Sequence, residues 1–287
     1  MAWRVLTSRF SILVLVVWAA APSTVSGQDL DFEPFGPGHG VAMGLSAFGG
    51  IALWSIGPPS RARWSSTNSF DMSVREELRL TTDGEREAAE RARDVLLGTL
   101  MATPILIDSL LVTGLLGENV DRALHLILIA IEAMGYGFLA HALLSRAIGR
   151  ERPNVLACTG SVIAGECGSA QARNTAFPSG HTTISFAAAG ALCATHLNAA
   201  VYGDLAADAV TCGTALAFAS TVALLRVAAD RHWLTDVMMG TTVGLLTGWL
   251  TPTLLHFTRW EGPAGSTMAF VPSAPRAEVG VSLALSH

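Results

Sequence analysis

Long apolar segments alternate with shorter polar ones along most of this chain. Five of them are long enough to cross or nearly cross a bilayer as helices: residues 95–116, 123–148, 182–197, 206–228 and 234–255. A membrane interior offers no water to backbone N–H and C=O groups, so such segments are expected to be helical. The pattern therefore predicts an all-α, polytopic transmembrane helical bundle of about five to six spans.

The N-terminal part of the chain leaves the number of spans open. Residues 1–27 combine two arginines, an apolar core and small residues before a cleavage position, which is typical of a secretory signal peptide; an uncleaved anchor is the alternative. Residues 41–56 are apolar but short and glycine-rich, so they either form a thin span or lie at the membrane surface. The chain then divides into an N-terminal segment with a polar linker (28–94), a membrane domain (95–257) and a tail (258–287).

Composition supports a membrane protein. The chain has 287 residues, a mean hydropathy of +0.45 and only 14% charged residues, which is too apolar for an ordinary soluble domain of this size. The formal net charge is -5, so no basic excess indicates nucleic acid as a partner.

Three polar clusters stand at the ends of apolar segments. They are residues 150–153, residues 178–181, and the trio Arg226, His232 and Asp236. The first two flank a single loop, and two further spans bring the chain back to the same side at Arg226. The count of crossings therefore predicts that all three clusters meet on one face of the membrane.

The second cluster suits an anion, because it opens an apolar helix. The first N–H groups of a helix have no internal partner and carry the positive end of its dipole. Gly180 would let an anion approach the backbone closely. Ser179 adds a hydroxyl donor, and His181 adds a group that can give a proton near neutral pH.

Taken together, the three clusters favour phosphoryl transfer. Arg152 and Arg226 can clamp a phosphoryl group with their planar guanidinium groups. His232 can attack phosphorus through an unprotonated ring nitrogen, while Asp236, one helical turn on, holds the other N–H. His181 would protonate the leaving oxygen. No cluster of Asp and Glu suggests Mg²⁺, so the pattern predicts a mechanism without metal or cofactor.

Several other residues in the apolar part are interpreted as structural. Gly240, Gly244 and Gly248 recur at a spacing of four, which is typical of close helix packing in lipid. Cys193 and Cys212 lie in apolar segments and are interpreted as small core residues. The same interpretation applies to six residues without a matching polar cluster: His39, His125, His141, His196, Arg231 and His256.

The three clusters resemble the motifs of the type 2 phosphatidic acid phosphatase, or PAP2, superfamily. That pattern has a Lys ahead of an Arg-Pro pair, then Pro-Ser-Gly-His, then Ser-Arg followed by His and Asp. The resemblance covers about residues 123–255 and keeps the family's spacing in the third motif. It implies a PAP2/haloperoxidase-like helical core and a phosphohistidine intermediate formed without metal.

The resemblance also implies roles for individual residues. His232 would be the nucleophile, His181 the general acid, and Asp236 the residue that orients His232. The phosphate would be held by Arg152, Arg226, Ser179 and Gly180.

Two positions depart from the family pattern. The lysine falls on Ser145, and the serine before the third-motif arginine falls on Leu225. The first departure removes a cation from the phosphate site. Arg146 and Arg150 are candidates to replace it, although Arg146 lies about 100° around a helix from Ser145. Reduced or altered activity is an expected consequence.

The side of the membrane depends on the N-terminal segment. The family usually acts outside the cytoplasm, which predicts a bacterial inner-membrane protein with its site facing the periplasm. With residues 1–27 cleaved, this holds only if residues 41–56 do not cross; a crossing there would put the site in the cytoplasm. Cys158 and Cys167 lie in the loop on the active face, so in an oxidising compartment we expect them to form a disulfide.

The sequence therefore predicts an integral membrane phosphatase whose substrate is a lipid phosphate or diphosphate and whose other partners are membrane lipids. Its oligomeric state stays open. One alternative is a vanadate-dependent haloperoxidase, which has a similar residue set but is mostly soluble. The other is a membrane protein that binds a lipid phosphate without turnover, because Ser145 stands in place of the lysine.

Overall fold

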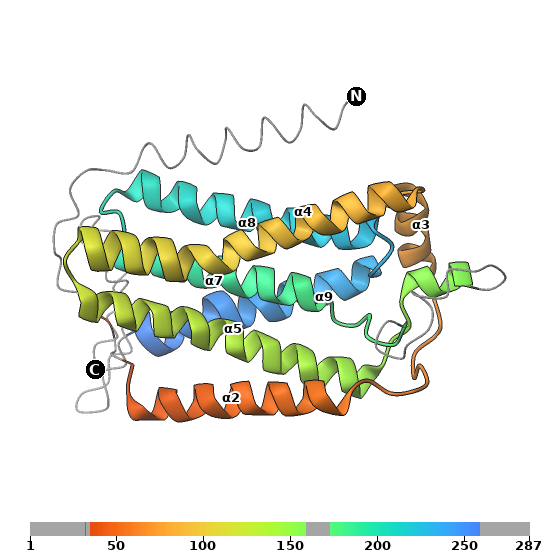
Figure 1. The fold of residues 1–287 in the computed structure, drawn as a ribbon, viewed down its shortest axis with the longest axis horizontal. Helices are drawn as coiled ribbons and strands as arrows, with labels where there is room; N and C mark the ends of the chain where they lie inside the picture. The colour runs from red at the N-terminus through yellow and green to blue at the C-terminus, as the bar shows by residue number, and fades with distance from the viewer. Residues whose placement is uncertain (1–31, 33–34, 159–172, 259–287) are drawn as a thin grey trace, which may run out of the picture.

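The chain folds into a bundle of long helices that run side by side (Figure 1). The computed structural model describes residues 32, 35–158 and 173–258, and among these no strand occurs. The membrane-length helices are α2 (Pro37–Ile56), α4 (Asp83–Ala102) continued by η1 (Thr103–Leu116), α5 (Val120–Ile148), α7 (Gly180–Ala199), α8 (Leu205–Ala228), and α9 (Leu234–Leu245) continued by η3 (Leu246–Leu250) and η4 (Thr253–Phe257). Two shorter helices are α3 (Ser69–Leu78) and η2 (Pro153–Cys158).

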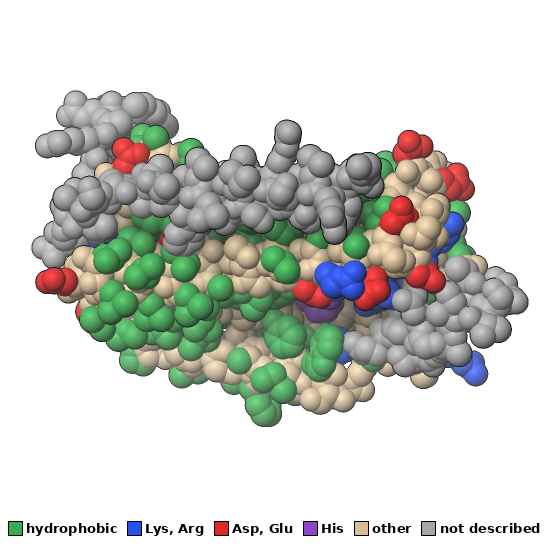
Figure 2. All heavy atoms as spheres, turned by 45° about the horizontal axis from the view of Figure 1, so that its top comes forward, with side chains coloured by type: hydrophobic (Ala, Val, Ile, Leu, Met, Phe, Trp, Pro, Cys, Tyr) green, Lys and Arg blue, Asp and Glu red, His purple; other side chains and the backbone are tan. Residues whose placement is uncertain are grey.

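Four of the described helices are long and apolar enough to cross a membrane: α2, α4 with η1, α5 and α8. Large apolar side chains stay exposed on their outer faces, for example Phe48 at 74% and Leu115 at 72%. Figure 2 shows such side chains spread along the helices, while most of the arginines on that face gather toward the end that holds α3. A bilayer would cover this apolar surface, so the protein is an integral membrane protein.

Helix α7 is the centre of the bundle. It packs against α8, α9, α5 and η3, and most of its residues are buried. A helix surrounded by protein on every side needs small side chains rather than strongly apolar ones. This explains why α7 is rich in alanine and is not among the four helices that are apolar enough to cross a membrane.

The predicted glycine face of α9 and η3 is confirmed. A Cβ atom added at Gly240 would lie 2.8 Å from the carbonyl oxygen of Ser179, and one at Gly244 would lie 2.6 Å from Cβ of Phe186. Only glycine allows α7 and α9 to approach this closely.

The interpretation of Cys193 and Cys212 as core residues is confirmed, since both are buried, but the sequence analysis did not foresee that they are paired. They form a disulfide between α7 and α8, with Cα atoms 4.6 Å apart. The two helices pack side by side, and this separation lies within the range that a disulfide requires. The predicted partner of Cys158, Cys167, lies outside the described residues, as do residues 1–27 and nearly all of the tail.

Helix α4 joins two segments that the sequence analysis kept apart. The charged stretch before residue 95 and the apolar stretch after it form one continuous helix, so the predicted domain boundary at 94/95 is not a structural break. A capping box starts this helix: the Thr82 side chain accepts from the Glu85 N–H at 3.3 Å, and the Glu85 carboxylate accepts from the Thr82 N–H at 3.2 Å. The polar turns that follow lie at the end of the bundle where α3 lies (Figure 1).

Helix α2 packs as part of the helical bundle. It packs along α5, and its C-terminal carbonyls of Leu53 and Trp54 accept hydrogen bonds from Arg146 at 2.8 and 3.2 Å. The short apolar stretch at residues 41–56 is therefore part of a helix as long as a span rather than a surface segment.

Candidate active site

The structure brings the three polar clusters together at one end of the bundle. The Ser179 N–H donates to the Asp236 carbonyl at 3.0 Å, which joins the second cluster to the third. The Ala176 N–H donates to the Arg150 carbonyl at 3.0 Å, and the Ala176 carbonyl lies 2.7 Å from Nδ1 of His232. The first cluster, the loop before α7 and the turn between α8 and α9 are thus linked through their backbones.

His232 is buried, and its ring orientation is set by the backbone. Nδ1 donates to the Ala176 carbonyl, which leaves Nε2 with a lone pair that can attack phosphorus. Burial, followed by the positive charges of Arg226 and Arg152, lowers the pKa of His232 well below its ordinary value. The ring is therefore neutral, as a nucleophile must be.

Asp236 has a different role from the one that the motif implied. Its carboxylate lies 3.8 Å from Nδ1 of His232, beyond hydrogen-bond distance. It accepts instead from the Trp233 N–H at 2.8 Å, at the start of α9, and from Arg150 at 2.5 Å. Asp236 therefore fixes the first turn of α9 rather than the tautomer of His232.

Arg150 is held within the protein by two carboxylates. It bonds the carboxylates of Asp71 and Asp236 at 2.7 and 2.5 Å, is 1% exposed, and lies over the rings of Trp64 and Trp233 at 3.9 and 5.5 Å. Burial alone would raise the pKa of Asp71, but hydrogen bonds from Arg150 and Thr235 outweigh it and leave this pKa lowered. The network is an ion pair with two buried carboxylates.

The structure does not bring either predicted replacement cation into the phosphate site. Arg150 is held by the two carboxylates, and Arg146 points away, onto the end of α2 and the ring of Trp54. Ser145 itself is fully buried and accepts a hydrogen bond from Arg146 at 2.8 Å. The cation that the family lysine would supply must come from elsewhere.

Two arginines that the motifs did not contain lie in the site. Arg93, from the polar end of α4, is buried, and its guanidinium contacts Nε2 of His181. Arg231, which the sequence analysis counted as structural, bonds Glu90 at 2.5 Å; Glu90 also lies 3.8 Å from Arg226. A polar face at the start of an otherwise apolar helix was the only sequence signal for Arg93.

The site holds more positive than negative charge. Arg93, Arg152, Arg226 and Arg231 act on one another electrostatically. The carboxylates near them are Glu90, Asp94, which lies 3.2 Å from Arg93, and Asp236, which is paired with Arg150. The Nε atoms of Arg152 and Arg226 are buried without a hydrogen-bond partner among the described residues. A buried N–H group without a partner costs free energy, and a phosphate offers oxygens that would accept a hydrogen bond from it.

The tetrapeptide at the start of α7 offers fewer free backbone N–H groups to an anion than the sequence analysis predicted. The Ser179 N–H is occupied by the Asp236 carbonyl, and its hydroxyl accepts from Thr182 at 2.9 Å. A Cβ atom at Gly180 would lie 2.7 Å from Nε2 of His141, so this glycine is required by the imidazole beneath it. The N–H groups of Gly180 and His181, in the first turn, stay available to an anion.

The part of the chain that carries these motifs matches a known protein family. The model of the PAP2 superfamily matches residues 125–260. Residues 125–260 form a PAP2 superfamily domain. No curated protein and no solved structure matches the chain.

The PAP2 region contains all three motifs but not the whole site. Arg152, His181, Arg226 and His232 lie inside the matched residues, whereas Arg93 precedes them on α4. Members of the superfamily are generally phosphatases, and the helical membrane architecture agrees with a function of the phosphatase type.

Proposed function

We propose that this protein hydrolyses a lipid phosphate or diphosphate through a phosphohistidine intermediate on His232, without a metal ion. The observation that carries the proposal is the group of four buried or half-buried arginines beside a neutral imidazole that a backbone carbonyl orients. Such a site binds a phosphate and presents a nucleophile to it.

In the first step, Nε2 of His232 attacks phosphorus and the bond from phosphorus to the lipid oxygen breaks. His181 gives its proton to that leaving oxygen. In the second step, water attacks phosphorus, the bond to Nε2 breaks, and His181 takes the proton from the water. Inorganic phosphate leaves, and both imidazoles return to their starting states.

Arg93 prepares His181 for this cycle. In the free protein its guanidinium donates to Nε2 of His181, so the ring is neutral there. A phosphate that draws Arg93 to itself releases this nitrogen, and the negative charge of the phosphate favours the protonated ring. We propose that Arg93 supplies the cation that Ser145 does not.

A lipid fits the position of the site. The motifs lie at one end of helices that present apolar side chains to the bilayer (Figures 1 and 2). A headgroup phosphate could enter among the arginines while its hydrocarbon tail stays in the membrane. A soluble phosphate ester has no hydrocarbon tail, so the apolar surface beside the site would not contribute to its binding.

We further propose that the site faces the periplasm of a bacterial inner membrane, the side on which the family usually acts. The N-terminal end of α2 and the end of η4 lie together, away from the site, since His39 and His256 are in ring contact at 4.5 Å. A periplasmic site therefore requires both of these ends to be cytoplasmic. With α2 crossing the membrane, residues 1–27 could then not act as a cleaved export signal.

Fusions after Thr258 test this orientation. A green fluorescent protein placed there is expected to fluoresce, and a bacterial alkaline phosphatase placed there is expected to be inactive. The opposite pattern would put the active site in the cytoplasm.

Phosphate release tests the activity. The purified protein is assayed at 25 °C in EDTA with phosphatidic acid, phosphatidylglycerol phosphate and undecaprenyl diphosphate, wild type beside His232→Ala. We expect release from at least one substrate that persists in EDTA and falls by about 10⁴-fold or more in the variant.

The departure at Ser145 favours a second candidate, a protein that binds a lipid phosphate without hydrolysing it. Folded wild-type protein that retains phosphatidic acid on vesicles but releases no phosphate from any substrate would support this candidate against the first.

A further inference from the structure

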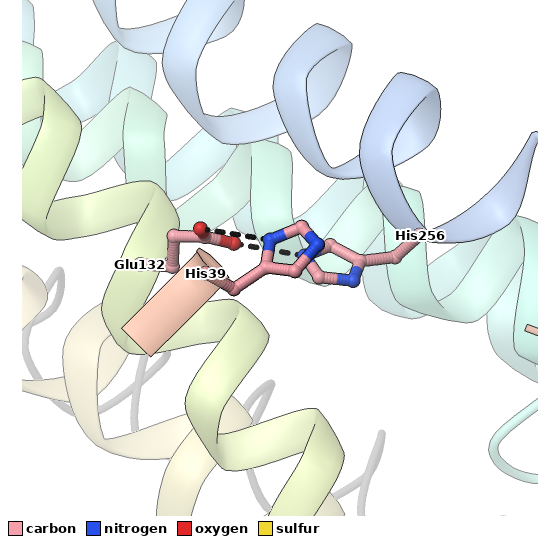
Figure 3. Close-up of side chains that lie close together, drawn as sticks. All are labelled: His39, Glu132 and His256. Carbon is pink, nitrogen blue, oxygen red and sulfur yellow. Dashed lines mark hydrogen bonds and ion pairs between the residues drawn. The ribbon is translucent and has the colours of Figure 1, made fainter. Parts of the chain in front are cut away.

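Three side chains from three helices converge at the end of the bundle opposite the active site. They are His39 near the start of α2, Glu132 in α5 and His256 in η4 (Figure 3). One ligand atom from each lies within 4.8 Å of the other two. Figure 3 shows the carboxylate of Glu132 facing nitrogen atoms of both imidazole rings.

The distances place the carboxylate between the two rings. Nδ1 of His39 lies 3.2 Å from Oε1 of Glu132, and Nε2 of His256 lies 2.8 Å from Oε2. The Tyr136 hydroxyl donates to Oε1 at 2.7 Å and so orients the carboxylate. Glu132 and His256 are 2% and 1% exposed, while the His39 side chain keeps 22% of its surface exposed and leaves a route of entry.

We propose that His39, Glu132 and His256 bind one Zn²⁺ ion. Two imidazole nitrogens and one carboxylate oxygen are a donor set that zinc takes, with its fourth position left to water. A single carboxylate with two nitrogens does not suit Ca²⁺ or Mg²⁺, which take oxygen ligands. The hydrogen bond from Tyr136 is the outer-sphere support that ligating carboxylates usually have.

The position of the site gives the ion a structural role. Helix α2 precedes the PAP2 region and packs mainly along α5. At one end α2 is held by Arg146, through the carbonyls of Leu53 and Trp54. At its other end the zinc site would join it to α5 and to η4, so that the ion closes the non-catalytic end of the bundle.

Zinc stoichiometry tests the proposal. The protein is purified with a tag that contains no histidine, stripped with EDTA, given ZnCl₂ and desalted, and bound zinc is measured by mass spectrometry. We expect about one zinc per chain in wild type and at least tenfold less in Glu132→Gln and in His256→Gln. His125→Gln, a histidine change on the same helix as Glu132, and His232→Ala are expected to keep the zinc.

Equal zinc in wild type and Glu132→Gln would overturn the proposal, and so would a loss in His232→Ala equal to that in Glu132→Gln. Thermal unfolding gives a second measurement on wild type alone. Saturating ZnCl₂ is expected to raise Tm by on the order of 5 °C. X-ray absorption at the zinc edge is expected to show imidazole nitrogens at about 2.0–2.1 Å; a spectrum without imidazole would also refute the site.

Discussion

Arg150 and Arg152 stand two residues apart and belong to clusters of opposite kinds. Arg150 meets two buried carboxylates and two tryptophan rings. Arg152 lies among Arg93, Arg226 and Arg231, and its guanidinium donates to the Thr175 hydroxyl at 2.9 Å rather than to a carboxylate. The positive charge of the first cluster is neutralised by carboxylates of the protein, whereas the positive charge of the second is neutralised only when an anion binds. Balance of buried charge thus separates a structural arginine from a ligand-binding one.

The balanced cluster supports the unbalanced one. Asp71 belongs to α3, and Arg75 of the same helix bonds Asp230 at 2.6 and 2.8 Å. Asp230 has a φ of 61° in the turn that carries His232, a conformation that costs free energy unless neighbouring contacts hold it. Helix α3 therefore fixes the turn that carries His232 through paired charges.

The largest expected effect is on stability. Arg150→Ala leaves Asp71 and Asp236 buried without their cation, which should lower the free energy of unfolding by about 3–5 kcal/mol. Circular dichroism during thermal unfolding in detergent measures this, with Arg152→Ala as the matched change. If both variants unfold at the temperature of wild type, the contrast between the two arginines fails.

The next effect is on catalysis. Arg152→Ala and Arg226→Ala should each lower kcat/KM by about 10²–10³-fold, because each removes a donor from the charge that develops on phosphorus. Both should unfold close to the temperature of wild type, because Arg226 lies 3.8 Å from its carboxylate and Arg152 bonds a hydroxyl, so neither makes the close pair of buried contacts that Arg150 makes. Loss of stability together with activity would argue that these arginines are structural.

A smaller effect is expected at Arg93. Arg93→Gln removes one charge-assisted hydrogen bond, worth about 1.5–3 kcal/mol, so kcat/KM should fall by about 10- to 100-fold. Arg91→Gln, an exposed arginine on the same helix that pairs with Glu87 at 2.5 Å, is the control and should not change the rate. Equal rates for the two variants would show that another group replaces the family lysine.

The smallest effect is a shift in the pH profile. Because burial and nearby arginines lower the pKa of His232, its neutral form persists as the pH falls through 6.5. The acid limb of kcat/KM that belongs to this group should therefore lie well below pH 6.5. In Arg226→Gln the limb should move up by about one pH unit. Substrate ionisation is the same for both proteins, so an unchanged limb would assign it to the substrate.

Three of the five predicted spans, and the meeting of the motifs at one end of the bundle, could be predicted because each depends on a simple count. Apolar length determines which segments cross, and the number of crossings determines which ends share a face. The N-terminal end of α7 and the turn at His232 were therefore predicted to lie on the same face of the membrane without knowledge of any contact. The close packing of α9 could be predicted in the same way, because small residues at every fourth position of a helix let a neighbouring helix approach closely.

Contacts between distant side chains could not be predicted in this way. Arg93 contacts His181, which lies 88 residues further along the chain. In the sequence, the residues around Arg93 look like an ordinary charged segment before a membrane span. The Ala176 carbonyl takes the hydrogen bond of His232 that the motif would assign to Asp236, because a loop backbone lies closer than the carboxylate. Cys193 and Cys212 pair because of how α7 and α8 pack, and neither helix alone carries a sign of it.

The most direct test of the account is detection of phosphate on His232. Wild-type protein is mixed with a lipid substrate labelled with ³²P, quenched in alkali, where phosphohistidine is stable, and digested for peptide mapping. The account predicts label on the peptide that contains His232 and none in His232→Ala. Turnover by wild type without any labelled protein, together with phosphate release by His232→Ala at a comparable rate, would contradict it.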